Sequence, residues 1–173
     1  PEEGELACCY SGPGRLADPH IIDYWVQYFL NKKTVLQNKT ILITAGRTEE
    51  KIDPVRIITN RSSGKTGFAL AKEAFYRGAK VILVTGPNNL FQLPGIEYYN
   101  ITSAKEMEQC VVKSFDQSDI IIASAADTDY RSRNIPKQKM KRSQKSISLD
   151  LIANPDILSD LGKKKNSKLL IGF

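Results

Sequence analysis

Short runs of β-branched and other apolar residues alternate along the chain with segments whose apolar residues recur every three or four positions. The first pattern predicts strands and the second predicts amphipathic helices. Strands are predicted at residues 41–43, 80–84, 98–101, 120–124 and 169–171, with a further possible strand at 147–151, and helices at residues 64–77, 103–113 and 154–161. This alternation is typical of an α/β fold, a Rossmann-like parallel sheet with helices on both faces.

The residues at the ends of these segments support the helix assignments. Gly78 follows the first helix at the C′ position, where glycine is preferred. Ser103 and Glu106 have the spacing of a capping box at the start of the second helix. The third helix starts at the Asn-Pro-Asp sequence of residues 154–156.

The N-terminal segment has a different pattern. Residues 4–14 are rich in glycine and predict a loop, and Asp18 followed by Pro19 predicts the cap and first turn of a helix. The apolar positions of this helix recur at three and four: Ile21, Ile22, Trp25, Val26, Phe29 and Leu30. It is therefore expected to be amphipathic.

Three parts follow from these patterns. We expect an N-terminal loop and helix at residues 1–30, a polar linker at 31–38, and a main domain at 39–173. The last predicted strand is followed by only two residues, Gly172 and Phe173, so we expect the main domain to be incomplete at its C-terminus.

A long polar loop separates the strand at 41–43 from the helix at 64–77. Median connections of this kind have about 4 to 6 residues, and much longer loops are usually functional or disordered. The loop carries many hydrogen-bonding side chains: Asp53, Arg56, Asn60, Arg61, Ser62, Ser63 and Lys65. Because ligands of parallel α/β sheets bind at the carboxyl ends of strands, we expect this loop to be functional.

Ser62, Ser63 and Gly64 lie where the loop meets the helix. Free backbone N–H groups and the positive end of the helix dipole can hold an anion there. The alternative is that Ser63 only caps the helix. The GKT sequence that begins at Gly64 is not a P-loop, because Thr59 stands where that motif needs its first glycine.

Two carboxylates, Asp127 and Asp129, follow the strand at 120–124 and are expected at the same edge of the sheet. One or two carboxylates suit Mg²⁺, which also takes waters and substrate phosphates; the alternative is a solvated turn. Residues 131–145 then carry seven basic and no acidic side chains. This stretch could neutralise a polyphosphate or form a solvated loop.

Composition narrows the class of protein. With 41% hydrophobic and 25% charged residues the chain is globular, and no apolar run approaches the roughly 20 residues of a membrane span, so we expect a cytoplasmic location. Three cysteines give neither a disulfide framework nor paired metal spacing. The net charge of +6 fits an anionic partner, but charge alone does not choose among nucleic acid, a membrane surface and a phosphorylated small molecule.

Cys8 and His20 are the two single residues that could act as reactive groups. Cys8 in the glycine-rich segment fits a reactive thiol or a small buried apolar side chain, and taken alone the second interpretation is favoured. His20, the only histidine, is predicted at the surface. Its position excludes a Ser–His or Cys–His nucleophile within residues 31–173.

Four motifs together resemble those of phosphopantothenate–cysteine ligase, the synthetase half of the bifunctional bacterial coenzyme A biosynthesis protein. They are DPVRIITNRSSGKTG (residues 53–67), AADTDYR (125–131), KMKR (139–142) and NPDI (154–157). The resemblance covers about residues 39–173. Residues 4–19 resemble the closing stretch of the other half, the flavin-dependent decarboxylase, and Cys8 matches its proton donor; the FMN-binding core of that half is absent from this sequence.

The resemblance implies a ligation in two steps. CTP activates 4′-phosphopantothenate to an acyl-cytidylate with release of pyrophosphate, and the amine of cysteine then displaces CMP. Asn60 matches the residue that holds the acyl-cytidylate, Arg56 the residue that turns it over, and Lys139 the residue that contacts the nucleotide and promotes activation. The resemblance also implies Mg²⁺, a dimer of ligase domains, and no nucleic-acid or membrane partner.

Further positions carry implied binding roles. Ser62, Ser63 and Gly64 match the phosphate cradle. The nucleotide site is matched by Ala125, Ala126, Asp129, Asn154, Pro155 and Asp156, of which Asp129 is also the implied metal ligand.

The chain departs from the family pattern at Arg47, where a second glycine is usual, at Asp127, where an apolar residue is usual, and at Cys9. Two rival functions stay open. One is an NAD(P)-binding reductase, which the fold favours although the Gly-x-Gly-x-x-Gly turn is missing after Ile43. The other is a nucleic-acid-binding module that uses residues 131–145.

Overall fold

The computed structural model describes residues 2–141 and 146–173, so Arg142 and Lys145 of the basic stretch lie outside the described residues. The strands are β1 (Glu2–Glu5), β2 (Ser11–Arg15), β3 (Thr40–Ala45), β4 (Glu49–Lys51), β5 (Ile57–Thr59), β6 (Lys80–Thr85), β7 (Glu97–Asn100), β8 (Ile120–Ala123), β9 (Tyr130–Ser132), β10 (Leu151–Ala153) and β11 (Leu169–Gly172). The helices are α1 (Pro19–Asn31), α2 (Lys65–Tyr76), α3 (Ala104–Phe115) and α4 (Ile157–Lys164).

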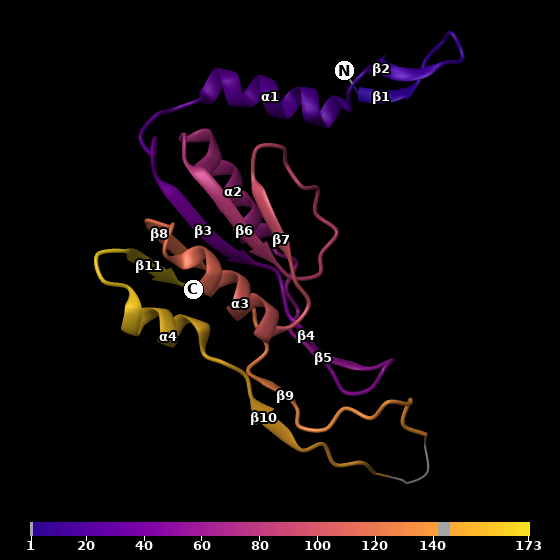
Figure 1. Ribbon diagram of the computed structural model, residues 1–173, viewed down its shortest axis with the longest axis vertical. Coiled ribbons are helices and arrows are strands. Elements are labelled where there is room, and N and C mark those ends of the chain that lie inside the picture. The colour runs from indigo at the N-terminus through magenta and orange to yellow at the C-terminus, as the bar shows by residue number, and fades with distance from the viewer. Residues whose placement is uncertain (1, 142–145) are drawn as a thin grey trace.

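A parallel sheet forms the centre of the molecule (Figure 1). Its five strands lie in the order β11-β8-β3-β6-β7. β3 pairs with β6 from Thr40 opposite Lys80 to Ala45 opposite Thr85, and it pairs with β8 along its other side. The predicted Rossmann-like α/β fold is confirmed.

Helices cover both faces of this sheet, and alternate residues of β3 point to opposite faces. Ile41 and Ile43 pack in a cluster with the α2 residue Phe68. Leu42 packs on the other face with residues of α3 and α4, among them Met107. Each fully buried apolar side chain of this size stabilises the fold by about 1.5–3 kcal/mol, so β3 contributes to the core on both faces of the sheet.

The predicted capping residues are confirmed, but α4 (Ile157–Lys164) lies three residues beyond the expected 154–161, because its N-cap is Asp156. Gly78 adopts a positive φ of 91° directly after the C-cap of α2. At α3 the Ser103 side chain accepts from the Glu106 N–H and the Glu106 side chain accepts from the Ser103 N–H, which completes the capping box. Asp18 and Asp156 cap α1 and α4 through hydrogen bonds from backbone N–H groups.

The prediction of a loop at residues 4–14 is wrong, because β1 and β2 form an antiparallel hairpin there. The turn between them is closed by a hydrogen bond from the Leu6 N–H to the Tyr10 carbonyl. Pro13 stands in β2 opposite Glu3, a position that a two-stranded ribbon with solvent-facing edges tolerates. Backbone pairing builds this hairpin, and its glycine-rich side-chain pattern does not reveal it.

The long loop after β3 contains a second hairpin, β4–β5, and a third pairing joins β9 to β10. The strand expected at 147–151 is wrong in position, because β10 begins at Leu151, which lies opposite Ser132, and ends at Ala153, opposite Tyr130. The short β9 limits this pairing to three positions. Both hairpins project beyond the carboxyl ends of the parallel strands (Figure 1).

α1 packs against α2 and the segment that precedes β7. The Tyr24 hydroxyl donates to the Pro94 carbonyl at 3.0 Å, and the Tyr76 hydroxyl donates to the Tyr24 carbonyl at 3.1 Å. The residues after α1 are tied to the end of α2, because the Lys33 N–H donates to the Tyr76 carbonyl. None of the helices in the described part of the chain has the length and apolar character that a membrane crossing requires.

Candidate functional site

A cavity of about 330 Å³ opens at the carboxyl edge of the sheet, between β8, β10 and α4. Its lining residues are Thr44, Met107, Ile121, Ala123, Ala125, Asp127, Asp129, Tyr130, Ala153, Asn154, Pro155, Asp156, Ile157, Leu158, Leu161 and Phe173. Pockets for small ligands and cofactors usually measure about 300–1,000 Å³ and combine an apolar lining with a few polar groups. This cavity has both properties.

Three carboxylates, Asp127, Asp129 and Asp156, line the cavity. Burial raises the pKa of the Asp127 carboxyl, and the nearby charges of Asp129 and Asp156 raise it further. A proton or a bound cation therefore relieves charge repulsion at this place. In the described part of the chain no three His, Cys, Asp or Glu side chains are arranged to hold a metal ion, so the protein offers no complete metal cage.

Asn154 builds one wall of the cavity. Its Nδ2 donates to the Thr128 carbonyl at 2.6 Å, and its Oδ1 accepts from Nη1 of Arg131 at 2.8 Å. Its backbone N–H donates to the Asp129 carbonyl. Asp156 continues the wall as the N-cap of α4. Asn154 therefore acts mainly by holding the segment that carries Asp129.

Asn60 brings the end of the β4–β5 hairpin to the rim of the cavity. Its Nδ2 donates to the Asp127 carbonyl at 2.8 Å and to the Ala126 carbonyl at 3.3 Å. The Ala126 N–H in turn donates to the Gly46 carbonyl at 2.8 Å. The segment after β3 and the segment after β8 are thus joined beside Ala125, which lines the cavity.

A buried threonine pair lies directly behind this rim. Thr48 and Thr128 are 0% and 5% exposed. The Thr128 N–H donates to Oγ1 of Thr48 at 2.8 Å, and the hydroxyl of Thr48 donates to Oγ1 of Thr128 at 3.1 Å. The Thr59 hydroxyl donates to the Thr48 carbonyl, so the same pair also anchors β5.

The N-terminus of α2 has an open form. The N-cap residue is Gly64, with φ of 77° and no side-chain cap, so Ser63 does not occupy the N-cap position. A Cβ on Gly64 would lie 3.2 Å from the Gly46 Cα, so a larger residue would press on the turn after β3. Ser62 and Ser63 approach the N–H groups of Gly64 and Lys65 only at 3.4 and 3.5 Å. The first-turn N–H groups are therefore suited to an anionic ligand.

Arg56 and the segment that carries Lys139 are joined by hydrogen bonds, and neither residue lines the cavity. The Arg56 guanidinium bridges Oδ2 of Asp53 and the carbonyl of Met140, the residue after Lys139. Burial alone would raise the pKa of the Asp53 carboxyl, but hydrogen bonds from the N–H groups of Val55, Arg56 and Met140 and from the Arg56 side chain lower it to about 2. Asp53 is therefore ionised at neutral pH.

The structure thus divides the predicted site residues into groups. Those that line the cavity are Ala125, Asp129, Asn154, Pro155 and Asp156. Those that lie outside its lining are Arg56, Asn60, Ser62, Ser63, Gly64, Ala126 and Lys139.

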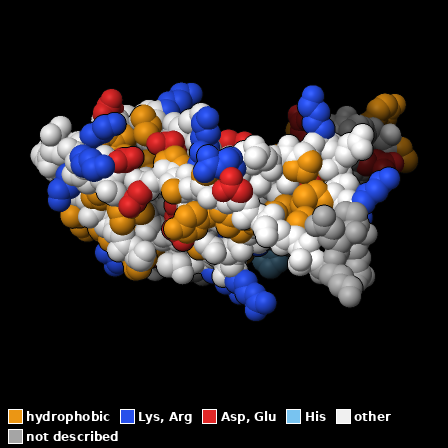
Figure 2. All heavy atoms as spheres, turned by 90° about the horizontal axis from the view of Figure 1, so that it is seen from below, with side chains coloured by type: hydrophobic (Ala, Val, Ile, Leu, Met, Phe, Trp, Pro, Cys, Tyr) orange, Lys and Arg blue, Asp and Glu red, His pale blue; other side chains and the backbone are white. Residues whose placement is uncertain are grey.

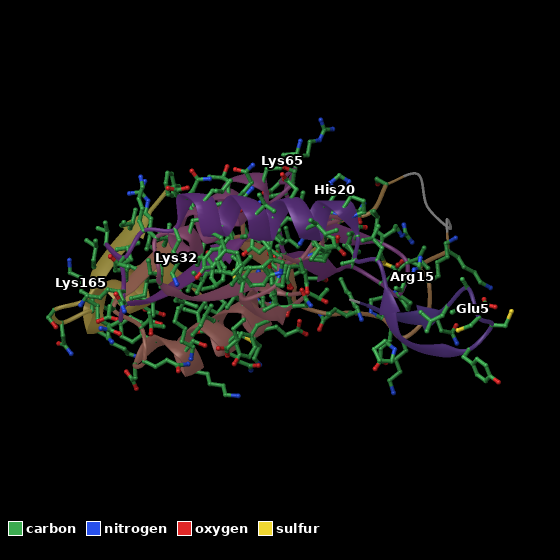
Figure 3. All side chains as sticks on the ribbon, turned by 90° about the horizontal axis from the view of Figure 1, so that it is seen from above. Glu5, Arg15, His20, Lys32, Lys65 and Lys165 are labelled. Carbon is green, nitrogen blue, oxygen red and sulfur yellow. The ribbon has the colours of Figure 1, made fainter. Side chains whose placement is uncertain are left out.

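Cys8 belongs to neither group. It is exposed in the turn between β1 and β2, and this hairpin lies at the other end of the long axis from β9 and β10 (Figure 1). In the view of Figure 3, Arg15 and Glu5 of the same hairpin lie at one end of the molecule and Lys165, directly after α4, lies at the other. Cys8 therefore has no access to the cavity of the same chain.

Sequence reasoning gave no role to Asp53 or to the threonine pair of Thr48 and Thr128. A usable signal was present for the first, because Asp53-Pro54 is a turn dipeptide between two short runs that can pair. The threonine pair joins positions 80 residues apart, and nothing local in the sequence indicates such a contact.

The fold and the cavity define a Rossmann-like α/β protein with a small-molecule site at the carboxyl edge of its sheet. Residues 36–173 match the family model described as the DNA/pantothenate metabolism flavoprotein C-terminal domain. The chain belongs to this family.

Curated relatives and solved structures agree with this assignment. Over the whole chain the sequence is 43% identical to the coenzyme A biosynthesis bifunctional protein CoaBC of Bacillus subtilis (strain 168) and 39% identical to that of Escherichia coli (strain K12). The chain spans 43% and 44% of the length of these two proteins, respectively.

Among solved structures, the crystal structure of the C-terminal domain of a CoaBC protein superimposes with a TM-score of 0.72 at 42% identity, covering 82% of this chain and 66% of that one. The DNA/pantothenate metabolism flavoprotein from Streptococcus pneumoniae gives 0.69 at 27% identity, covering 78% of this chain and 69% of that one. A Cab2 mutant in complex with phosphopantothenate-cysteine gives 0.61, covering 88% of this chain and 68% of that one, but at 18% identity it shows the fold alone.

Proposed function

We propose that this chain acts in coenzyme A biosynthesis as a phosphopantothenate–cysteine ligase domain, which uses CTP to join cysteine to 4′-phosphopantothenate. The observation that carries the proposal is the convergence of the segments that follow β5, β8 and β10 at one cavity, where Asn154 follows β10. Asn60 is bonded to the Asp127 carbonyl, and Asp129 lines the cavity beside it. The similarity to coenzyme A biosynthesis bifunctional proteins supports a role in that biosynthesis.

The first step activates the acid. A carboxylate is a poor acyl donor, so the carboxylate of 4′-phosphopantothenate attacks the α-phosphate of CTP, forms an acyl-cytidylate and releases pyrophosphate. This chemistry depends on positioning and on stabilisation of negative charge. In this proposal the open N-terminus of α2 at Gly64 supplies N–H donors for a phosphate, and Lys139 supplies a positive charge.

The second step forms the amide. The amine of cysteine attacks the acyl carbon, CMP leaves, and the amide product is 4′-phosphopantothenoylcysteine. Asn60 is at the rim where the activated acid would lie, because its carboxamide is bonded to the two carbonyls that follow Ala125. In this proposal Asn60 holds the intermediate, and Arg56 promotes its turnover.

A magnesium ion fits the donor set. Mg²⁺ binds through one or two carboxylates, waters and substrate phosphates and needs no complete protein cage. Asp129 would hold it at the cavity, where Asp127 and Asp156 supply two further carboxyl groups. When bound, the ion would offset charge on the triphosphate.

The rival functions have weaker support. β3 is followed by the β4–β5 hairpin, which separates it from α2, so the tight strand-to-helix turn of dinucleotide-binding proteins is missing. On the face in Figure 2, basic and acidic side chains are interspersed and form no continuous basic patch. The first observation disfavours a dinucleotide-binding reductase, and the face in Figure 2 gives no support to nucleic-acid binding.

The test measures each half-reaction. The chain is incubated with CTP, Mg²⁺ and 4′-phosphopantothenate, and pyrophosphate is measured before and after cysteine is added. We expect CTP-dependent pyrophosphate without cysteine, and CMP with the amide product after its addition. Isothermal titration with CTP, ATP, NADPH and a short oligonucleotide is run in parallel. Absence of pyrophosphate together with binding of NADPH, or salt-sensitive binding of the oligonucleotide, would contradict the proposal.

A further inference from the structure

Asp53 is a buried carboxylate that no substrate contact explains. Its residue is 1% exposed, in the turn between β4 and β5. Oδ1 accepts from the N–H groups of Val55 and Arg56, both at 2.8 Å. Oδ2 accepts from Nε of Arg56 at 3.0 Å and from the Met140 N–H at 3.1 Å. Both carboxylate oxygens therefore accept hydrogen bonds from the hairpin, and one of them also accepts from Met140, which is distant in sequence.

Met140 is held at both of its backbone polar groups. Its N–H donates to Asp53, and its carbonyl accepts from Nη2 of Arg56 at 2.7 Å. In the described part of the chain these are the hydrogen bonds that join residues 133–141 to the β4–β5 hairpin. Because a peptide unit is planar, holding the Met140 N–H also holds the carbonyl and the Cα of the preceding residue, Lys139.

The contact has a specific chemical requirement. An ionised carboxylate accepts from several donors at once, whereas an asparagine amide presents an NH₂ group to one of them. The ion pair between Asp53 and Arg56 orients the guanidinium so that its remaining N–H reaches Met140. A neutral residue at position 53 would therefore release Met140 even if the hairpin stayed folded.

We propose that Asp53 is a positioning residue that, through Arg56 and Met140, sets the place of Lys139 for the activation of the acid. The inference rests on the proposed function, because it assigns Lys139 to the activation step. Both Asp53 oxygens accept hydrogen bonds from other residues of this chain, so its proposed role is exerted through those residues. Lys139 and Arg56 are the two cations expected to act in successive steps. The backbone of Met140, which follows Lys139 and is bonded to Asp53 and Arg56, links them.

The first experiment tests the contact between Asp53 and Met140 without measuring enzyme activity. Trypsin cleavage after Lys141 requires the backbone on both sides to enter the protease, so it reports whether Met140 is released. Asp53→Asn and Met140→Pro each remove one side of the contact. Gln138→Pro places a proline in the same segment without removing the Met140 N–H, and Asp160→Asn removes an exposed ion pair with Lys163.

We expect cleavage of Asp53→Asn and Met140→Pro to be about 10- to 100-fold faster than in the unmodified chain, the range for loss of a hydrogen bond to a charged group. The two controls should cleave at the unmodified rate. Met140→Pro keeps the test valid if Asp53→Asn fails to fold. Equal cleavage in Met140→Pro and Gln138→Pro would overturn the contact.

The second experiment is a double-mutant cycle on pyrophosphate release. If Asp53 acts through Lys139, Asp53→Asn lowers kcat, leaves KM for 4′-phosphopantothenate unchanged, and slows the Lys139→Gln chain no further. Additive losses would overturn the positioning role in a chain that is otherwise active. Failure of the proposed function would look different, since the unmodified chain would release no CTP-dependent pyrophosphate while the cleavage ratios persisted.

Discussion

Thr48 and Thr128 lie 80 residues apart in the sequence and form a closed pair of hydrogen bonds in the interior, with the hydroxyl of each donating to the other residue. Oγ1 of Thr48 also accepts from the Thr128 N–H. The pair holds the segment that continues to Asp129 against the segment that continues into β4. The shape of the cavity therefore depends on a contact that involves no predicted catalytic group.

This pair gives a stability prediction. Thr48→Val keeps the shape of the side chain but leaves the buried Thr128 N–H without its acceptor, which costs about 1–3 kcal/mol. Urea denaturation measures the loss in free energy of unfolding. Thr66→Val, at an exposed position in α2, is the matched control and should change little. Equal stability of the two variants would show that the pair contributes nothing.

Asp127 gives a prediction about pH. Its pKa is raised above the ordinary value of 3.8 by burial and by Asp129 and Asp156, so its ionisation opposes folding. The cost is absent below the unfolded pKa and complete above the folded pKa. Asp127→Asn should therefore raise the free energy of unfolding at pH 7 and lose this advantage as pH falls below about 4.

Denaturation of both chains across that pH range measures the difference. Asp150→Asn is the control, because Asp150 forms an exposed ion pair with Arg133 and such pairs contribute about 0–1 kcal/mol. A constant difference between Asp127→Asn and the unmodified chain at all pH values would contradict the argument.

Lys139 and Asn60 give a prediction about the two half-reactions. Lys139→Gln should lower pyrophosphate release by about 10²- to 10³-fold, as for loss of a single electrostatic donor. Asn60→Asp should allow pyrophosphate release but impair amide formation, because a carboxylate would face the Asp127 carbonyl that Asn60 now contacts. Pyrophosphate without cysteine and product with cysteine are measured for each variant.

Lys113→Gln, in the last turn of α3 and exposed, is the control for loss of a positive charge. The division of roles between Lys139 and Asn60 is refuted if both variants lose the two half-reactions to the same extent.

The contact between α1 and the rest of the chain is tested at two tyrosines. Tyr24→Phe removes the hydrogen bond to the Pro94 carbonyl and should cost about 0.5–1.5 kcal/mol. Tyr28 stacks on Phe75 at 4.9 Å, and its hydroxyl has no hydrogen-bond partner in the described residues. Tyr28→Phe should therefore be near neutral. A larger loss for Tyr28→Phe would contradict this assignment, and thermal unfolding of both variants decides between them.

The central sheet could be predicted from the sequence because its strands carry their own signal. Ile41 to Ile43 and Ile120 to Ile122 are apolar runs bounded by polar residues, and such runs are buried on both faces of a parallel sheet. Helix caps such as Ser103 were predictable for a similar reason, since capping depends on residues three apart.

The three antiparallel pairings were harder to predict, because their strands have only three to five residues and several of them are polar or rich in glycine. The β4 sequence, Glu49-Glu50-Lys51, has no strand propensity of its own, and Glu50 is buried because it accepts from the Ala104 N–H at the start of α3. The arrangement of the site was also hard to predict from local sequence. The motifs identified Asp129 and Asn154, but the hydrogen bonds that place them come from Thr48 and other residues distant in sequence.

The central place of β3 has a consequence for synthesis of the chain. β3 pairs early with β6, but its other neighbour, β8, begins about 75 residues after β3 ends. At about 5–20 residues per second, ribosomes need roughly 4 to 15 s to add that length. During this interval one side of this apolar strand has no partner on the nascent chain, and it is open to pairing with other unfinished chains.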